Sequence, residues 1–288
     1  MPPMIGVATC AAVPDLDEDG GLLLAALHEA GARARPVVWD DPAVDWAAFD
    51  AVLVRSTWDY PLRHAEFLRW ARGCPRTVNP VDVLAWNTDK RYLDDLARAG
   101  VPTVPTVLVP PGTAWTAPDG DHVVKPTVSG SAADTGRFRD RGDPEAAALV
   151  ARLHAQGRTA MVQPYLPGIE AEGETSVVFL GGVLSHAVRR APLLTATGVR
   201  AAVGVADVLA ELRAVPVTGA QRAVAEAALD AVPGGRDRLS YARVDLVPGP
   251  AGPVLLELEA TDCFLFLSVA AEPAAVARMA AHVVTEVG

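Results

Sequence analysis

The chain has 288 residues, half of them hydrophobic, with a formal net charge of −10 at pH 7 and an isoelectric point near 5.0. This length and apolar content predict a folded protein with two or three compact domains. The acidic balance argues against a nucleic-acid partner, because proteins that bind phosphate backbones concentrate Lys and Arg.

The cysteines and the apolar segments set further limits. Cys10, Cys74 and Cys263 are far apart and lack CxxC spacing, so we expect neither a disulfide framework nor a zinc site. The first residues carry no basic region before their short apolar run, and no stretch is long enough to span a bilayer. We therefore expect a cytoplasmic protein without a membrane partner. The sequence leaves open whether it forms a homo-oligomer.

The first third of the chain alternates strand-like and helical segments. Residues 5–9, 35–39 and 51–55 have the pattern of strands, and residues 21–30 that of an amphipathic helix. Residues 76–79 resemble a fourth short strand. This alternation predicts an α/β domain with a parallel sheet covered by helices.

The rest of the chain predicts an α+β arrangement, in which antiparallel strands have helices on one face. The expected elements are a helix over 90–98, a strand over 121–125, hairpin strands 176–180 and 183–187, a helix over 218–231, hairpin strands 241–247 and 254–259, and a helix over 273–287. We expect residues 1–83 to form an N-terminal α/β domain, residues 84–162 a central subdomain and residues 163–288 a C-terminal subdomain.

Lys125 ends a predicted strand and is followed by a loop of small residues that includes Ser129, Gly130 and Ser131. Such a loop lets backbone N–H groups approach phosphate oxygens while the lysine supplies positive charge. An ordinary turn is the more frequent explanation for a Gly/Ser loop of this kind. The loop alone therefore does not establish a phosphate site.

An apolar segment over residues 162–168 contains Gln163, Tyr165 and Leu166, and Glu174 follows it. An adenine ring needs such a segment, since main-chain atoms can bind its edge while aliphatic side chains cover its faces. An interdomain linker is the alternative, and on this segment alone we favour the linker.

Charged residues alternate on the strands of the second predicted hairpin. Arg243 and Asp245 are two positions apart on one strand, and Glu257 and Glu259 on the other, so each pair shares a face of the sheet. Three carboxylates on one face repel one another, and a divalent cation bound together with substrate phosphates removes that cost. A solvated face with salt bridges is the alternative. The apolar residues between the charged positions favour the metal site.

These motifs, in this order, resemble those of the ATP-grasp superfamily over about the last two thirds of the chain. VQPYLPGIEAEGETSVVFLGGVLSHAVRRAP resembles the adenine-binding hinge and hairpin of glutathione-synthetase-type enzymes, and RVDLV with LLELEA resembles their metal-binding pair. The resemblance implies an ATP-grasp fold with an N-terminal parallel-sheet domain, and ATP and Mg²⁺ as cofactors. Glu259 stands where most members carry Asn, which keeps an oxygen ligand but changes the charge of the site.

The resemblance also implies roles for individual residues. The phosphates would contact Lys90, Lys125, Ser129, Gly130 and Ser131; the adenosine Gln163, Tyr165, Leu166 and Glu174; magnesium Asp245, Glu257 and Glu259; and the transferred phosphoryl group Arg243 and Lys125.

Three further strings narrow the resemblance. VRSTWDY, NPVDVLAWNTDKRYL and KPTVSGSAADT resemble a smaller ATP-grasp group that includes the O-ureido-D-serine cyclo-ligase of D-cycloserine biosynthesis. Each string is several residues long and rare Trp positions are included, so chance matching is improbable. ELEATDCFLFL departs from the more usual Glu-Pro-Ser ending of the group by having Thr261, Asp262 and Cys263, which hints at a specialised substrate.

We therefore predict a ligase that activates the carboxylate of a small amino-acid-like substrate as an acyl phosphate and then forms a C–N bond. The specific expectation is cyclisation of O-ureido-D-serine to D-cycloserine. An intermolecular carboxylate–amine ligase and a non-catalytic nucleotide-binding module are the alternatives. We expect the substrate at the ends of the first-domain strands, where Arg55 would clamp a carboxylate. The other candidate substrate residues are Cys10, Ser56, Thr57, Trp58, Asp59 and Arg190. For Arg55 and Asp59, a surface position at a strand end is the alternative.

Overall fold

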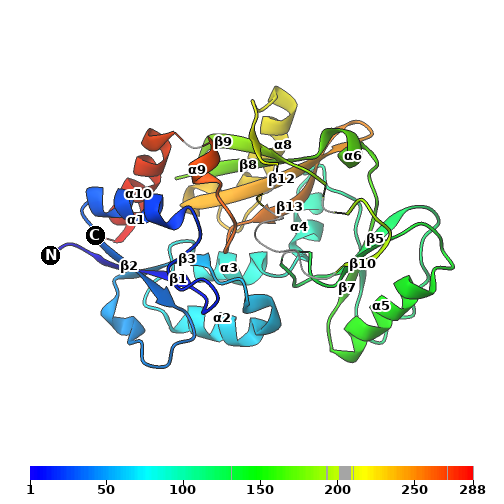
Figure 1. Cartoon of the computed structure of the whole chain (residues 1–288), viewed down its shortest axis with the longest axis horizontal. Coiled ribbons are helices and arrows are strands. Elements are labelled where there is room, and N and C mark those ends of the chain that lie inside the picture. The colour runs from blue at the N-terminus through cyan, green and yellow to red at the C-terminus, as the bar shows by residue number, and fades with distance from the viewer. Residues whose placement is uncertain (131, 193, 201–208, 210, 271, 288) are drawn as a thin grey trace.

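The computed structural model describes residues 1–130, 132–192, 194–200, 209, 211–270 and 272–287, and the strands of these residues form three sheets (Figure 1). The candidate phosphate residue Ser131 lies outside the described residues. In the described part, no helix combines the length and the apolar character that crossing a membrane requires.

The first sheet has the order β2-β1-β3 with both pairings parallel, which confirms the parallel sheet expected from the sequence. Its strands are β1 (Met4–Thr9), β2 (Arg33–Val38) and β3 (Ala51–Ser56). The helices of this region are α1 (Gly20–Glu29), η1 (Trp46–Ala48), η2 (Tyr60–Leu62), α2 (His64–Gly73) and α3 (Val81–Asn87). The fourth strand expected at residues 76–79 was wrong. Thr77 forms only an isolated bridge with Val52, since prolines lie on both sides of this short segment.

The second sheet is antiparallel and has the order β10-β6-β5-β7-β4. Its strands are β4 (Val107–Val109), β5 (His122–Pro126), β6 (Thr135–Phe138), β7 (Ala160–Pro164) and β10 (Gly198–Arg200). Helix α4 (Tyr92–Arg98) precedes it, near the expected helix, and α5 (Pro144–Ala155) packs on it. Sequence analysis did not identify α5, although Asp143 caps its first turn and Pro144 begins it.

The third sheet has the order β11-β9-β8-β12-β13 and contains both predicted hairpins, which are confirmed. Its strands are β8 (Glu174–Leu180), β9 (Val183–Arg190), β11 (Arg213–Ala214), β12 (Tyr241–Gly249) and β13 (Gly252–Glu259). Between β8 and β9, Gly181 and Gly182 have φ angles of 61° and 71°, the left-handed conformation that a two-residue hairpin turn requires. The helices are α6 (Gly168–Glu172), α8 (Gly219–Asp230), η3 (Arg236–Arg238), α9 (Leu267–Ala270) and α10 (Pro273–Val287).

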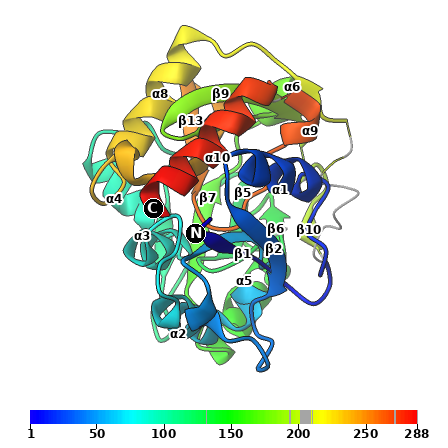
Figure 2. The same cartoon turned by 90° about the vertical axis from the view of Figure 1, so that its left-hand side faces the viewer.

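The two faces of the third sheet have different surroundings, and this difference positions the site. On one face, residues such as Val177 and Val244 pack with the apolar sides of α4 and α8 in one core cluster. On the other face, Leu180 and Tyr241 belong to the core cluster that includes α1 and α10, which lie side by side in Figure 2. Farther along this second face, α10 no longer covers the strands.

The expected division at residues 83 and 162 stays a prediction. Helix α3 crosses residue 83 and strand β7 crosses residue 162. Moreover, one core cluster joins Val83 and Leu93 to strands β8 and β12. The first of the expected boundaries thus lies in a packed helix.

Candidate active site

A pocket lies between the second and third sheets, and residues from the N-terminal region and from the segment after β13 close one end of it. The lining comes from the second sheet and its loop (Val123, Lys125, Ser129, Gly130, Ala132, Thr135), the hinge after β7 (Gln163, Pro164, Tyr165, Leu166, Ile169), the third sheet (Glu174, Arg190, Arg243, Asp245, Val247, Leu256, Glu257, Glu259), single residues of other segments (Lys90, Val104, Leu194) and a closing group (Trp58, Pro61, Asp262, Cys263, Phe264). Most of the predicted nucleotide and metal residues therefore share one pocket.

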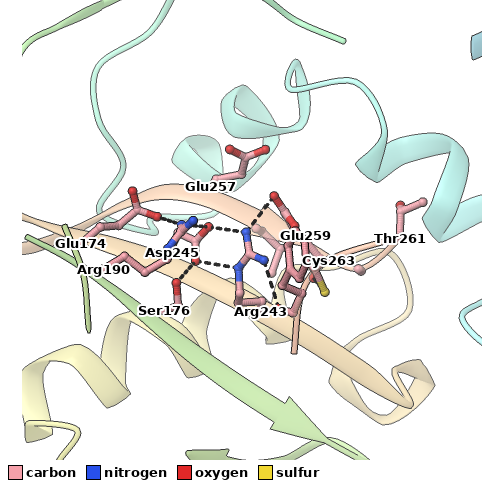
Figure 3. Close-up of polar contacts among 12 residues, drawn as sticks. Glu174, Ser176, Arg190, Arg243, Asp245, Glu257, Glu259, Thr261 and Cys263 are labelled. Atoms are coloured by element: carbon pink, nitrogen blue, oxygen red, sulfur yellow. Dashed lines mark hydrogen bonds and ion pairs between the residues drawn. The ribbon is translucent and has the colours of Figure 1, made fainter. Parts of the chain in front are cut away.

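Arg243 is the centre of the charged network on the third sheet (Figure 3). Its Nε and Nη2 donate to the two carboxylate oxygens of Asp245 at 2.9 Å each, and Nη2 also lies 2.9 Å from Glu259 Oε1. The register places Arg243 opposite Glu259 and Asp245 opposite Glu257, as the period of two predicted. Arg190 from β9 pairs with Glu174 and, at 3.0 Å, with Asp245.

Burial and ion pairing act in opposite directions on these carboxyl groups. Burial raises the pKa of Asp245, but Arg243 and Arg190 outweigh it and bring that pKa down to about 2. Burial raises the pKa of Glu259 to about 7 because Arg243 offsets only part of the cost, and the pKa of Glu174 also rises to about 7 despite Arg190. Burial therefore disfavours the ionised forms of Glu174 and Glu259 more than the neighbouring arginines favour them.

Two buried lysines face the same pocket from the other side. Lys90 Nζ lies 2.9 Å from Glu257 Oε1 and donates to the backbone oxygen of Ser129 at 2.9 Å. Lys125 forms no ion pair or hydrogen bond with any described residue, and burial lowers its pKa. Burial raises the pKa of Glu257, but Lys90 and Lys125 outweigh this effect and lower it. Lys125 is thus an ammonium group available to an anion in the pocket.

The hinge contains contacts that sequence analysis did not foresee. Arg137 of β6 stacks on the ring of Tyr165 with its guanidinium carbon 3.4 Å from the centroid, and it pairs with Glu170 of α6 at 2.7 Å. Tyr165 Oη donates to the same carboxylate at 3.0 Å. The predicted adenine residue Gln163 donates its side-chain amide to Thr106 Oγ1 at 2.9 Å. Side chains of the second sheet, of the residue before β4 and of α6 therefore hold the hinge in place.

Arg55 lies behind the pocket and is not among the residues that line it. Its side chain is 1% exposed. The guanidinium donates to the backbone oxygen of Cys263 at 3.0 Å and to Asp17 Oδ2 at 3.5 Å, and it lies over the ring of Tyr241. Its assignment as a carboxylate clamp stays a prediction, but the structure places the guanidinium against protein atoms.

Some of the other substrate candidates line the pocket and some do not. Ser56, Thr57 and Cys10 are buried outside the pocket lining, whereas Trp58 and Arg190 line it. Asp59 also lies outside the lining, where it accepts a hydrogen bond from Trp39 Nε1 at 2.9 Å and pairs with Arg63. Their substrate roles stay predictions.

The closing group contains residues that sequence analysis did not assign to the substrate. Asp262 and Phe264 line the pocket, and the ring of Phe264 lies 4.9 Å from that of Trp58 between centroids. Burial and the neighbouring Glu259 raise the pKa of Asp262 to about 8. In the sequence, only one feature pointed to this segment: Thr261, Asp262 and Cys263 replace the usual Glu-Pro-Ser ending of the group.

The residues present fit a magnesium ion bound with substrate phosphates. Among the described residues, no three or more His, Cys, Asp or Glu side chains converge into a complete metal cage. Mg²⁺ ordinarily takes one or two carboxylates and completes its shell with phosphate oxygens and water. One or two of the hard oxygen donors Asp245, Glu257 and Glu259 would meet that requirement, and their role as ligands stays a prediction. Burial, together with Glu257 and Asp245, raises the pKa of Glu259, and a nearby cation would offset that cost.

Known proteins resemble this chain in sequence and in structure. Residues 5–81 match a family model described as D-cycloserine synthetase DcsG, N-terminal domain. The cycloserine biosynthesis protein DcsG of Streptomyces lavendulae is 36% identical over 208 residues, which cover 68% of this chain and 70% of that protein.

Among solved structures, the crystal structure of D-cycloserine synthetase DcsG superposes with a TM-score of 0.90 at 34% identity, covering 99% of this chain and 100% of the other. The ATP-grasp ligase PsnB, complexed with a minimal precursor, superposes with a TM-score of 0.63 at 17% identity, covering 100% of this chain and 99% of that one. The likeness to PsnB bears on the fold alone.

Proposed function

Because the chain belongs to the DcsG family of ATP-grasp ligases, we propose that it catalyses the ATP-dependent cyclisation of O-ureido-D-serine to D-cycloserine. The cycloserine names of its relatives support this substrate. The residues that line the pocket support the chemistry, which is activation of a carboxylate followed by formation of a C–N bond.

One observation carries the proposal: the ammonium of Lys125, which has no ion pair with a described residue, and the Arg243 network line the same pocket. Phosphoryl transfer asks a protein mainly for positioning and for neutralisation of charge. Lys125 and Lys90 supply positive charge from the side of the second sheet, and Arg243 supplies it from the third. A triphosphate in this pocket would have cationic groups on opposite sides.

The chain's own groups account for the first step. The substrate carboxylate attacks the γ-phosphorus of ATP, and ADP leaves. Arg243 is held in one orientation by its two hydrogen bonds to Asp245, which fixes its positive charge at the pocket, where it would stabilise the transferred phosphoryl group. Magnesium, when bound by Asp245, Glu257 and Glu259, would neutralise charge on the phosphate oxygens.

The second step closes the ring. The substrate nitrogen that is bonded to oxygen attacks the acyl carbon, and inorganic phosphate leaves with the bonding electron pair. Water then hydrolyses the bond between the ring nitrogen and the carbamoyl carbon, so that the nitrogen gains a proton, the carbamoyl group leaves as carbamate (carbon dioxide and ammonia), and D-cycloserine remains. The pocket lining, which includes Trp58 and Phe264, would limit the access of water that competes with the nitrogen for the acyl phosphate.

The test is to incubate the protein with ATP, Mg²⁺ and O-ureido-D-serine and to measure ADP and D-cycloserine by chromatography, with and without an added amine such as D-alanine. We expect ADP and D-cycloserine to appear together without any second amine. ADP release that requires the added amine, with a coupled product, would instead identify an intermolecular ligase. ATP binding without ADP release across a panel of amino acids would identify a nucleotide-binding module.

A further inference from the structure

Asp262 differs from the other carboxylates that line the pocket. Glu174, Asp245, Glu257 and Glu259 each form an ion pair with an arginine or a lysine. Asp262 lines the same pocket, and its carboxylate has neither an ion pair nor a hydrogen bond with any other described residue. It is therefore the pocket carboxylate that has no cationic partner among the described residues.

The backbone on both sides of Asp262 is fixed by hydrogen bonds. The backbone N–H of Ala260 donates to Asn87 Oδ1 at 2.7 Å, and the backbone oxygen of Thr261 accepts from Tyr241 Oη at 2.5 Å. On the other side, the backbone oxygen of Cys263 accepts from Arg55. The next two backbone oxygens, those of Phe264 and Leu265, accept from Arg243 and His186.

These contacts come from strands β3, β9 and β12 and from helix α3, so several rigid elements position the segment at once. Side chains that are held by such supporting contacts keep a defined position in a binding site. Asp262 is thus presented to the pocket from a fixed backbone. The contact of Arg55 with Cys263 makes Arg55 one of the groups that hold this segment.

The position of Asp262 along the chain relates it to the reacting groups. It follows Glu259 by three residues and lines the same pocket, and the backbone oxygen of Phe264, two residues further on, accepts a hydrogen bond from Arg243. In an α-amino acid, the ammonium is bonded to the carbon that also carries the carboxyl group. A substrate whose carboxyl group is phosphorylated beside Arg243 and Glu259 therefore places its ammonium within the same small region.

We infer that Asp262 binds the ammonium group of the substrate and makes the enzyme selective for amino acids over carboxylic acids that lack an amino group. The inference rests on the proposed function, and it names the residue that recognises the substrate class. A substrate ammonium beside this half-buried carboxylate, which has no ion pair with a described residue, forms a charge-assisted hydrogen bond. It also removes the cost of keeping that carboxylate ionised.

The test compares Asp262→Asn with the wild type on O-ureido-D-serine and on 3-(ureidooxy)propanoic acid, its analogue without the α-amino group. Asn keeps the size of the side chain and removes its charge. We expect kcat/KM for O-ureido-D-serine to fall about 10- to 100-fold, mainly through KM, because a hydrogen bond between charged groups is lost. With the analogue, kcat/KM should change less than about twofold, so the preference for the amino acid should largely disappear.

Controls separate recognition from folding. Asp119→Asn removes a carboxylate that is 83% exposed and should leave both substrates unaffected. ATP affinity and the melting temperature of Asp262→Asn should match those of the wild type. If Asp262→Asn does not fold, Asp262→Ser is the second neutral variant. Equal losses with both substrates, or no loss with either, would overturn the inference.

The same assays keep this inference distinct from the proposed function. A wild type that releases ADP with D-serine but not with O-ureido-D-serine would refute the proposed cyclisation. The Asp262 comparison would then use D-serine and 3-hydroxypropanoic acid. Loss of the preference for D-serine in Asp262→Asn would support the inference, and an unchanged preference would overturn it. A wild type that fails to release ADP with any of the amino acids tested would refute both the proposed function and this inference.

Discussion

Arg243 and Arg55 are both buried, and both donate to the segment that follows β13, but their other neighbours differ. Arg243 binds the Phe264 backbone oxygen and directs the rest of its guanidinium to Asp245 and Glu259, which line the pocket. Arg55 binds the backbone oxygen of Cys263 and otherwise meets Asp17 and the ring of Tyr241, behind the pocket. Two similar side chains therefore suit different tasks, one in phosphoryl transfer and the other in holding the segment.

The difference shows which local patterns determine the direction of a side chain. On β12, alternation places Arg243 and Asp245 on one face, and pairing with β13 places two more carboxylates beside them. At the end of β3, the parallel sheet gives the position of Arg55 but not its partners. The position of Arg55 at the end of β3 therefore predicts that it lies near the pocket, but it does not predict where its guanidinium points.

The largest effect should come from Arg243→Lys, which keeps the charge of the network and removes the planar pair of hydrogen bonds to Asp245. We expect kcat for ADP release to fall on the order of a hundredfold or more, as when one donor to a transition-state anion is lost. Steady-state kinetics would measure this, with ATP affinity measured in parallel. Activity within about threefold of the wild type would remove Arg243 from the reacting centre.

Arg55→Lys tests the other side of the comparison. A lysine cannot reproduce the separate contacts with Cys263 and Asp17, so we expect the free energy of unfolding to fall by about 2 to 3 kcal/mol. Denaturant unfolding measures this loss, and ATP affinity should not change. A variant that is as stable as the wild type but loses its affinity for the amino-acid substrate would restore Arg55 to the carboxylate clamp predicted from the sequence.

Lys125→Ala should have a smaller effect, and on binding only. Lys125 has no ion pair with a described residue, and burial lowers its pKa, so its removal should not reduce stability. We expect the Kd for ATP to rise about tenfold, the value of one charge-assisted contact. Lys90→Ala is the matched control, because it also breaks the 2.9 Å ion pair with Glu257 and should lower the melting temperature. Unchanged ATP affinity in Lys125→Ala, measured by calorimetry, would contradict the phosphate role.

Much of the fold could be predicted from the sequence where periodicity and turn residues agreed. The ATP-grasp fold and the ligase class are confirmed, as are the parallel first sheet and both hairpins. Helix α5 was not identified, although its buried residues (Ala146, Leu149, Val150 and Leu153) recur at helical spacing. The strand expected at residues 76–79 was wrong, because the prolines on both sides limit this short segment to a single bridge with Val52.

The site was predictable for its charged hairpin and less so for its closing group. The contact between Arg55 and Cys263 joins residues separated by 208 positions, and no local pattern encodes it. In the sequence, Asp262 was notable only because it belongs to the unusual segment that follows Glu259. Its importance became visible when the structure showed that the other pocket carboxylates form ion pairs. Contacts of this kind depend on how the whole chain packs.

The smallest effect should come from Asp59→Asn, the most direct test of the predicted site at the end of β3. Asp59 accepts from Trp39 Nε1 at 2.9 Å and lies 3.4 Å from Arg63, while Arg63 also pairs with Asp40 and Glu66. Asn retains an oxygen for Trp39, so the charge of a partly exposed pair is the main loss. Such pairs contribute about 1 kcal/mol or less. We expect the free energy of unfolding to fall by no more than this, with kcat/KM for O-ureido-D-serine within about twofold of the wild type. A large loss of kcat/KM at unchanged stability would mean that the substrate reaches the end of β3. The substrate site would then include the region of Arg55, and the contrast between Arg243 inside the pocket and Arg55 behind it would not hold.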